Sequence, residues 1–224
     1  MKCMFWTLAT NHSKMHNSSP ANELPDNQIP GNPGNPGNPG NPGNPGNPGN
    51  QIPDNQMPDN QPPDSWLTEN SHYLRPNGHV LDLACGSGRN TSFLLSLGFQ
   101  VTCIDIDTRG MSELEKRTGC TVIQADLEND NPWPLNGTFD AIVVINYLYR
   151  PLFSHLIESL AEGGILIYKT FMEGNEKFGR PSNPDFLLKK NELIDAFGRE
   201  LRVLSFDQGY EEPAAMTQRI CVAR

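Results

Sequence analysis

An acidic side chain and two glycines follow one another where an apolar segment gives way to a helical pattern. A strand predicted over Val80–Ala84 contains Asp82, and Gly86 and Gly88 come directly after it. A helix is predicted over Asn90–Leu97. A strand, a glycine turn and a helix together are typical of a nucleotide site, because glycine lets the backbone approach a ligand closely.

A second acid stands in register with this motif. Asp105 lies seventeen residues past Gly88 and follows a second apolar strand, Val101–Ile104. A carboxylate at that place accepts hydrogen bonds from both ribose hydroxyls of a nucleoside. The two segments together predict a nucleoside-containing ligand.

The glycine spacing also indicates which nucleotide binds. A dinucleotide fingerprint has glycine at the position of Thr91 and no acid just before the glycines. Asp82 would repel a pyrophosphate but not a ligand that carries an ammonium and a sulfonium. The pattern D-x-A-x-G-x-G therefore favours S-adenosylmethionine over NAD.

The stretch Val80–Arg89 resembles the first motif of the Rossmann-like (class I) S-adenosylmethionine-dependent methyltransferases. These families usually carry glycine where Ala84 stands, and alanine is a common variant. The resemblance covers about residues 65–224 and is nearest to bacterial small-molecule enzymes of unassigned substrate. It implies that S-adenosylmethionine is bound by Asp82, Ala84, Gly86, Ser87, Gly88, Asp105, Ile106, Asp126 and Leu127.

The same resemblance implies a reacting centre at Asn146 and Tyr147, which end a strand predicted over Ala141–Ile145. An equally weighted alternative is that Tyr147 only packs. Tyr147 and His155 are weak candidates for a base, and His155 lies on the apolar face of a predicted helix, where a core histidine is the commoner case.

The segment Lys169–Leu188 resembles an insertion found in a bacterial methyltransferase family with no settled substrate. Its glycines Gly174 and Gly179 suggest a lid over a small acceptor. Candidate ligands for an anionic acceptor are Arg150, Lys177 and Arg180. The alternative is that these are ordinary exposed cations.

Strands alternate with helices from Trp66 onward, as a doubly wound α/β sheet requires. We therefore predict a seven-stranded Rossmann-like methyltransferase sheet with flanking helices. The remaining strands are predicted over Thr121–Gln124, Ile165–Tyr168, Leu201–Ser205 and Arg219–Ala223. The remaining helices are predicted over Met111–Arg117, Pro151–Glu162 and Asn191–Phe197, with Gly163 and Gly164 as the stop of the second.

Residues 1–64 differ from the rest in composition. They hold 13 of the 20 prolines, and Gly31–Pro48 is six Gly-Asn-Pro triplets. We expect a disordered low-complexity tail, with a short collagen-like stalk as the alternative. Deleting residues 1–64 is expected to leave folding and cofactor affinity intact, because the tail has no periodic apolar face.

Charge and cysteine content exclude several classes. The chain has 17 basic and 26 acidic side chains, of which the tail holds 2 and 5, so residues 65–224 carry a net charge near −6. This argues against broad nucleic-acid binding through a basic surface. The five cysteines form no C-x-x-C pair and no metal spacing. No apolar run approaches a membrane span, and the chain is expected to be cytoplasmic; Cys3–Thr10 as a weak signal-peptide core is the alternative.

The predicted function is methyl transfer from S-adenosylmethionine to a small-molecule acceptor, without a metal. Two other classes stay open. One is a catalytically silent S-adenosylmethionine-binding partner subunit. The other is a nicotinamide oxidoreductase, against which Asp82 and Thr91 argue.

Overall fold

The computed structural model describes residues 61–129 and 132–224. The predicted tail and its Gly-Asn-Pro repeat lie outside these residues, apart from residues 61–64. Within them, seven strands form one sheet in the order β3-β2-β1-β4-β5-β7-β6. Their bounds are β1 His79–Leu83, β2 Gln100–Asp105, β3 Cys120–Gln124, β4 Phe139–Ile145, β5 Leu160–Phe171, β6 Arg202–Glu211 and β7 Ala215–Ala223. The predicted seven-stranded α/β sheet is confirmed.

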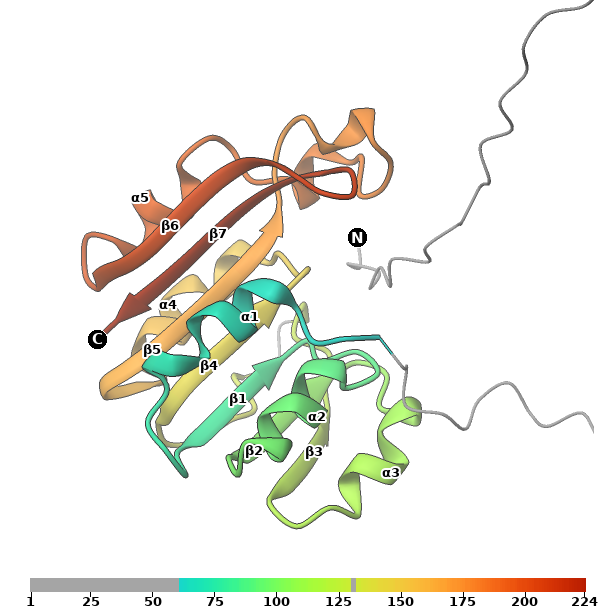
Figure 1. Ribbon diagram of the computed structural model, residues 1–224, viewed down its shortest axis with the longest axis vertical. Helices are drawn as coiled ribbons and strands as arrows, with labels where there is room; N and C mark the ends of the chain where they lie inside the picture. Colours follow the sequence, from blue (N-terminus) through green and yellow to red (C-terminus); the bar gives the residue numbers. More distant parts are fainter. Residues whose placement is uncertain (1–60, 130–131) are drawn as a thin grey trace, which may run out of the picture. The chain divides into compact units, whose positions relative to one another are not determined.

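The strand order indicates the edge of the sheet at which a ligand would bind. Strands β1 to β5 are parallel, whereas β7 runs antiparallel to β5 and β6 antiparallel to β7. The chain direction along the sheet reverses between β1 and β4, and ligands of open α/β folds bind outside the carboxyl ends of the strands at such a point. Figure 1 shows these strand ends pointing to the same side of the sheet.

Each face of the sheet is covered by its own helices. These are α1 Ser65–Asn70, α2 Arg89–Ser96, α3 Ser112–Glu115, α4 Phe153–Glu158 and α5 Glu192–Phe197. One core joins Leu81, Leu83 and Val144 to side chains of α4 and α5, and the other joins Val80, Val101 and Val143 to side chains of α1, α2 and α3. Alternate residues of a strand face opposite sides, so the unbroken apolar run of β4 serves both cores. The helices α1 and α2 lie in front of the sheet in Figure 1, and α4 lies behind it.

The structure corrects the sequence prediction near the middle of the chain. The helix predicted over Pro151–Glu162 is a 3-10 turn followed by α4, which ends at Glu158, and β5 already begins at Leu160. Gly163 and Gly164 therefore lie inside β5 and do not stop a helix. The pairing of β4 with β5 slips there, because Phe139 pairs with Leu160 while Ala141 pairs with Ile165. Gly163 has a φ of 72°, which suits a bulge that only glycine forms without strain.

Two further elements differ from the prediction. The β6–β7 hairpin is longer than predicted and extends to Glu211 and Ala215. The first helix, α1, was not predicted, although Asp64 caps it by accepting a hydrogen bond from the Trp66 N–H at 2.9 Å. Among residues 61–129 and 132–224, no helix has the length and apolar character needed to cross a membrane.

Candidate functional site

The loop between β1 and α2 bends sharply at the carboxyl edge of the sheet. Ala84, Gly86 and Gly88 have φ values of 59°, 56° and 85°. The loop is held by two backbone hydrogen bonds, from the Cys85 N–H to the Ile104 carbonyl at 3.2 Å and from the Gly88 N–H to the Cys85 carbonyl at 3.0 Å. A left-handed conformation is costly for alanine, so Ala84 carries backbone strain of the kind that collects at functional sites.

The two glycines of this loop have different physical roles. A Cβ at Gly86 would meet no atom within 4 Å, so this backbone borders open space that a ligand can occupy. A Cβ at Gly88 would lie 2.4 Å from Leu114 Cδ1 and 2.6 Å from Met111 Sδ. Gly88 is therefore required by the packing of α3 against the loop, and Gly86 by access to the loop.

Asp105 is joined directly to this loop. Its carboxylate accepts the Gly86 N–H at 2.6 Å and the Asp107 N–H at 2.9 Å, and its side chain is buried. Burial raises the pKa of Asp105 above its ordinary value, while the two N–H donors act in the opposite direction. Each carboxylate oxygen has a second acceptor position, so the group retains the capacity to accept further hydrogen bonds.

Asp82 is placed behind the loop and holds the first turn of α2. It is 1% exposed and accepts a hydrogen bond from the Thr91 hydroxyl at 2.6 Å. Burial raises the pKa of Asp82 from its ordinary 3.8 to about 7, although the Thr91 hydrogen bond opposes this. Thr91 stands where the dinucleotide fingerprint has glycine. A glycine there would have no hydroxyl to donate to Asp82.

The other predicted cofactor residues lie at the same edge. Ser87, Ile106, Asp126 and Leu127 are half-buried and follow the ends of β1, β2 and β3. Asp126 accepts the Glu128 N–H at 3.0 Å, which stabilises the turn after β3. The structure thus brings all nine predicted cofactor residues to the carboxyl ends of three adjacent strands.

Asn146 and Tyr147 lie at the end of β4. Asn146 has a φ of 58°, and its N–H donates to the Lys169 carbonyl at 2.8 Å. Tyr147 is 6% exposed and belongs to the apolar core, and its carbonyl accepts a hydrogen bond from the Tyr168 hydroxyl at 2.9 Å. The φ of Asn146 is in the left-handed region, which asparagine adopts more readily than most residues. The chain therefore turns sharply at this strand end.

His155 lies on α4. Its ring stacks on Trp133, with ring centroids 5.3 Å apart and planes 5° apart. The His155 side chain is 43% exposed. It is therefore not the buried core histidine that the sequence favoured.

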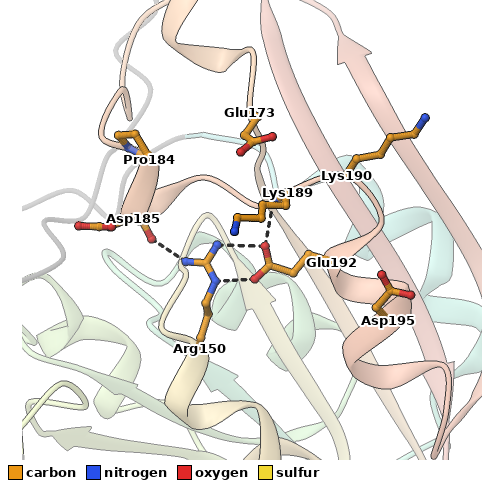
Figure 2. Close-up of a pocket in the computed structure, with 8 residues that line it drawn as sticks. All are labelled: Arg150, Glu173, Pro184, Asp185, Lys189, Lys190, Glu192 and Asp195. Atoms are coloured by element: carbon orange, nitrogen blue, oxygen red, sulfur yellow. Dashed lines mark hydrogen bonds and ion pairs between the residues drawn. The ribbon is translucent and has the colours of Figure 1, made fainter.

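Arg150 holds the insertion that follows β5. Its guanidinium forms a two-pronged ion pair with Glu192 and donates to the carbonyl of Asp185 at 2.8 Å (Figure 2). It also donates to the carbonyl of Leu187 at 2.9 Å. Burial opposes the charge of Glu192, but the hydrogen bonds and positive charges of Arg150 and Lys189 together outweigh burial and lower the pKa of that carboxyl. The donors of Arg150 are thus engaged in fixing the loop, which the sequence did not indicate.

A pocket of about 650 Å³ opens beside this ion pair, as Figure 2 shows. It is lined by Arg150, Glu173, Pro184, Asp185, Lys189, Lys190, Glu192 and Asp195. Of the three predicted acceptor residues, Arg150 lines this pocket, whereas Lys177 and Arg180 are exposed elsewhere in the insertion. The mixed charges of the lining suit a polar acceptor.

Sequence reasoning missed three charged residues at this edge: Asp64, Lys169 and Glu192. Asp64 was placed in the predicted tail, yet it is 7% exposed in the described domain. The available signal was local, because Asp64 followed by a short helical pattern is a typical helix start. The partners of Lys169 and Glu192 are remote in sequence and left no such signal.

The structure forms a doubly wound α/β domain with a sharply bent glycine loop at the carboxyl edge of its sheet. Residues 80–164 match the family described as "Methyltransferase domain". The matched stretch runs from β1 into β5, so this part of the sheet is similar to a methyltransferase domain.

One curated relative is the "Putative methyltransferase YqeM" of Bacillus subtilis (strain 168), which is 30% identical over 108 residues. The match covers 42% of this chain and 43% of the relative, so the chain spans less than half of that protein.

Solved structures share the fold at low identity. TehB from Haemophilus influenzae is 19% identical, with a TM-score of 0.58 over 70% of this chain and 61% of that one. The 1,6-didemethyltoxoflavin-N1-methyltransferase of Burkholderia thailandensis, which was solved with its acceptor and S-adenosylhomocysteine, is 16% identical, with a TM-score of 0.55 over 71% of this chain and 76% of that one. The N-methyltransferase NodS of Bradyrhizobium japonicum WM9 is 16% identical, with a TM-score of 0.55 over 75% and 99%. At these identities the likeness concerns the fold.

Proposed function

We propose that this domain binds S-adenosylmethionine at the β1–α2 loop and transfers its methyl group to a small-molecule acceptor. The observation that carries the proposal is Gly86. Its left-handed backbone borders open space, and its N–H is bonded to Asp105, within the stretch that matches the methyltransferase family. Four of the solved structures with this fold were determined with S-adenosylhomocysteine bound, which supports the same ligand here.

The residues at the loop fit this cofactor. The space at Gly86 accommodates a ligand against the backbone, and Asp105 offers acceptor positions for ribose hydroxyls. Asp126 and Leu127, after β3, lie where the adenine end would bind. Asp82 is a buried acid behind the loop, and an acid does not attract an anion. This suits a ligand without a pyrophosphate.

The acceptor side is formed by the segments after β4 and β5. Asn146 and Tyr147 end β4, and Arg150 connects this segment to the insertion through Glu192. The mixed-charge pocket beside Arg150 supports a small polar acceptor. We propose Lys177 and Arg180 as further acceptor contacts, since both are exposed on the same insertion.

The bound cofactor supplies a sulfonium methyl group that is already activated for displacement. The acceptor nucleophile forms a bond to the methyl carbon as the carbon–sulfur bond breaks, and the electron pair of that bond stays on sulfur. An acceptor that carries a proton also loses it to water or a base. The task of the protein is then to align the two partners and to exclude water, for which a rigid loop and strained strand ends are suited.

Calorimetry with S-adenosylmethionine, followed by detection of S-adenosylhomocysteine release across oxygen, nitrogen and sulfur nucleophiles, tests the proposal. Binding with turnover of one acceptor class supports a methyltransferase. Binding without turnover of any acceptor supports a silent partner subunit. Failure to bind S-adenosylmethionine together with NADH binding in a fluorescence titration supports an oxidoreductase and refutes the proposal.

We further propose a cytoplasmic location and a division of the chain into a low-complexity segment and one catalytic domain. Cys103 and Cys221 are fully buried as free thiols among apolar side chains, which suits a reducing compartment. Comparing the melting temperature of the full chain with that of residues 61–224 tests the division of the chain.

A further inference from the structure

Three charged side chains outside the proposed reaction are buried together beside α1. Lys169 Nζ lies 3.2 Å from Asp64 Oδ2 and 2.6 Å from Glu211 Oε1, and the side chains of Lys169, Asp64 and Glu211 are 8%, 7% and 18% exposed. Burying charges costs free energy, and apolar side chains of similar size would fill the same space without that cost. Stability alone therefore does not account for this cluster, and its role is to be found in the elements that it connects.

Asp64 connects to the start of α2. Its N–H donates to Asn90 Oδ1 at 3.0 Å, and its carboxylate lies 3.7 Å from Arg89 Nη2. Arg89 also donates to the Pro62 carbonyl at 3.4 Å. Arg89 and Asn90 directly follow Gly88, so residues 62–64, which we call the strap, are tied to the helix that the glycine loop leads into.

Lys169 connects the strap to the end of β5 and to β4. Its backbone pairs with Ile145, and its carbonyl accepts the Asn146 N–H at 2.8 Å. The contacts of the strap therefore join the start of α2 to the end of β5. Figure 1 shows the chain entering α1 across this end of the sheet.

Glu211 anchors the cluster to the β6–β7 hairpin. It accepts a hydrogen bond from the Thr217 hydroxyl at 3.0 Å. On the same hairpin, the Arg219 guanidinium lies over the Trp66 ring at 4.9 Å, and the Trp66 indole N–H donates to the Ile220 carbonyl at 3.3 Å. The first residues of the domain are thus fixed from both sides, so the strap has one defined path.

We propose that Asp64 is a positioning residue for methyl transfer. Its carboxylate holds the start of α2 through Arg89, and the backbone beside Asn146 through Lys169, while its backbone N–H adds a contact with Asn90 that side-chain variants leave in place. The ion pair keeps the cofactor loop and the acceptor edge in fixed relation. This inference rests on the proposed function. It also places Asp64 within the cofactor-binding domain, against our expectation that removing residues 1–64 would be harmless.

Full-length variants test the role of Asp64. Asp64→Asn keeps an acceptor for the Trp66 N–H and removes the charge, while Asp64→Ala removes both. Arg224→Ala is the matched control, because it breaks three hydrogen bonds to the carbonyls of Ile157, Glu158 and Leu160, which lie outside the strap and the glycine loop. The measurements are melting temperature, S-adenosylmethionine affinity well below melting, and hydrogen exchange of the glycine-loop amides.

We expect Asp64→Asn to weaken S-adenosylmethionine binding roughly three- to thirtyfold, the range of couplings carried through neighbouring residues. Exchange at the amides of Gly86 and Gly88 should rise, while Arg224→Ala lowers the melting temperature and leaves both readouts unchanged. The double variant with Asp64→Asn and Lys169→Met should lose less binding free energy for S-adenosylmethionine than the sum of the losses in the two single variants, because the pair acts as a unit.

Unchanged affinity and exchange in both Asp64 variants, with wild-type binding intact, would overturn the inference and leave the proposed function standing. An equal affinity loss in Arg224→Ala would also overturn it, because the effect would then follow general stability. A wild-type chain that does not bind S-adenosylmethionine refutes the proposed function itself, and the inference with it.

Discussion

Substituting alanine for each glycine of the β1–α2 loop should separate ligand access from packing. At Gly86 the φ of 56° makes alanine cost about 1–2 kcal/mol, the usual penalty for a left-handed residue. A domain of this size loses about 2–4 °C in melting temperature per kcal/mol, so Gly86→Ala should melt about 2–8 °C lower. Its Cβ meets no protein atom within 4 Å and would occupy proposed cofactor space.

At Gly88 the same left-handed penalty is joined by a clash. The added Cβ would lie 2.4 Å from Leu114 and 2.6 Å from Met111, and both of these side chains are buried. Overpacking of this kind costs about 1–3 kcal/mol, so Gly88→Ala should lose about 2–5 kcal/mol and melt about 4–20 °C lower.

The affinity for S-adenosylmethionine should change in the opposite order. The Cβ of Gly86→Ala would occupy proposed ligand space. If it reduces the binding free energy by about 1–3 kcal/mol, the usual cost of overpacking, the affinity should fall by about 5- to 150-fold. Folded Gly88→Ala should bind more tightly than Gly86→Ala. Calorimetric titration at low temperature and thermal melting of both variants give the four values needed.

A third variant controls for the assignment of the clash. Leu114→Ala in the Gly88→Ala background removes the atom nearest to the new Cβ. It should therefore lower the free energy of unfolding less in that background than in the wild-type chain. Wild-type affinity in Gly86→Ala would refute the placement of the cofactor against this loop. A Gly88→Ala variant that melts no lower than Gly86→Ala would refute the packing argument.

Three further outcomes follow from the same structure. Asp105→Ala should weaken S-adenosylmethionine binding by about ten- to a hundredfold, the effect of losing about 1.5–3 kcal/mol of hydrogen bonding to a charged group, and unchanged affinity would contradict the ribose assignment. Burial raises the pKa of Asp82 from 3.8 to about 7, so the folded state holds this proton more tightly than the unfolded chain and the free energy of unfolding falls as pH rises through this range. Asp82→Asn should reduce that slope in denaturant titrations at several pH values, and an unaltered slope would count against the raised pKa. Arg180→Ala should lower turnover with little change in melting temperature, whereas Arg150→Ala should lower the melting temperature because it releases the insertion, and the reverse pattern would exchange their assigned roles.

The sheet and the cofactor loop were predictable because their signals are local. The apolar strands, the acid at Asp105 and the glycines of the loop are each written in a few consecutive residues. The parallel direction of β1 to β5 is consistent with the alternation of strands and helices, since parallel neighbours need a crossover between them.

The errors arose where a remote contact decides the structure. Gly163 and Gly164 resemble a helix stop, but pairing with β4 draws Leu160 into a strand. Asp64 adjoins a proline-rich segment, but Lys169, 105 residues away, holds it in the domain. The role of Arg150 in fixing the insertion was also not predicted, because Glu192 and the two carbonyls that engage its donors lie far away in the sequence.

The insertion leaves and re-enters the sheet at one point. The Leu188 N–H donates to the Phe171 carbonyl at 3.0 Å, and the Glu173 N–H donates to the Leu188 carbonyl at 2.9 Å. Because its ends are held together, the cost of closing the intervening loop depends only weakly on its length. Within it, residues 176–180 are all exposed, whereas Asn175 and Leu187 are buried. Libraries that vary the length and sequence of residues 176–180 could therefore redirect the proposed acceptor choice while the glycine loop, nearly ninety positions earlier in the chain, is left untouched.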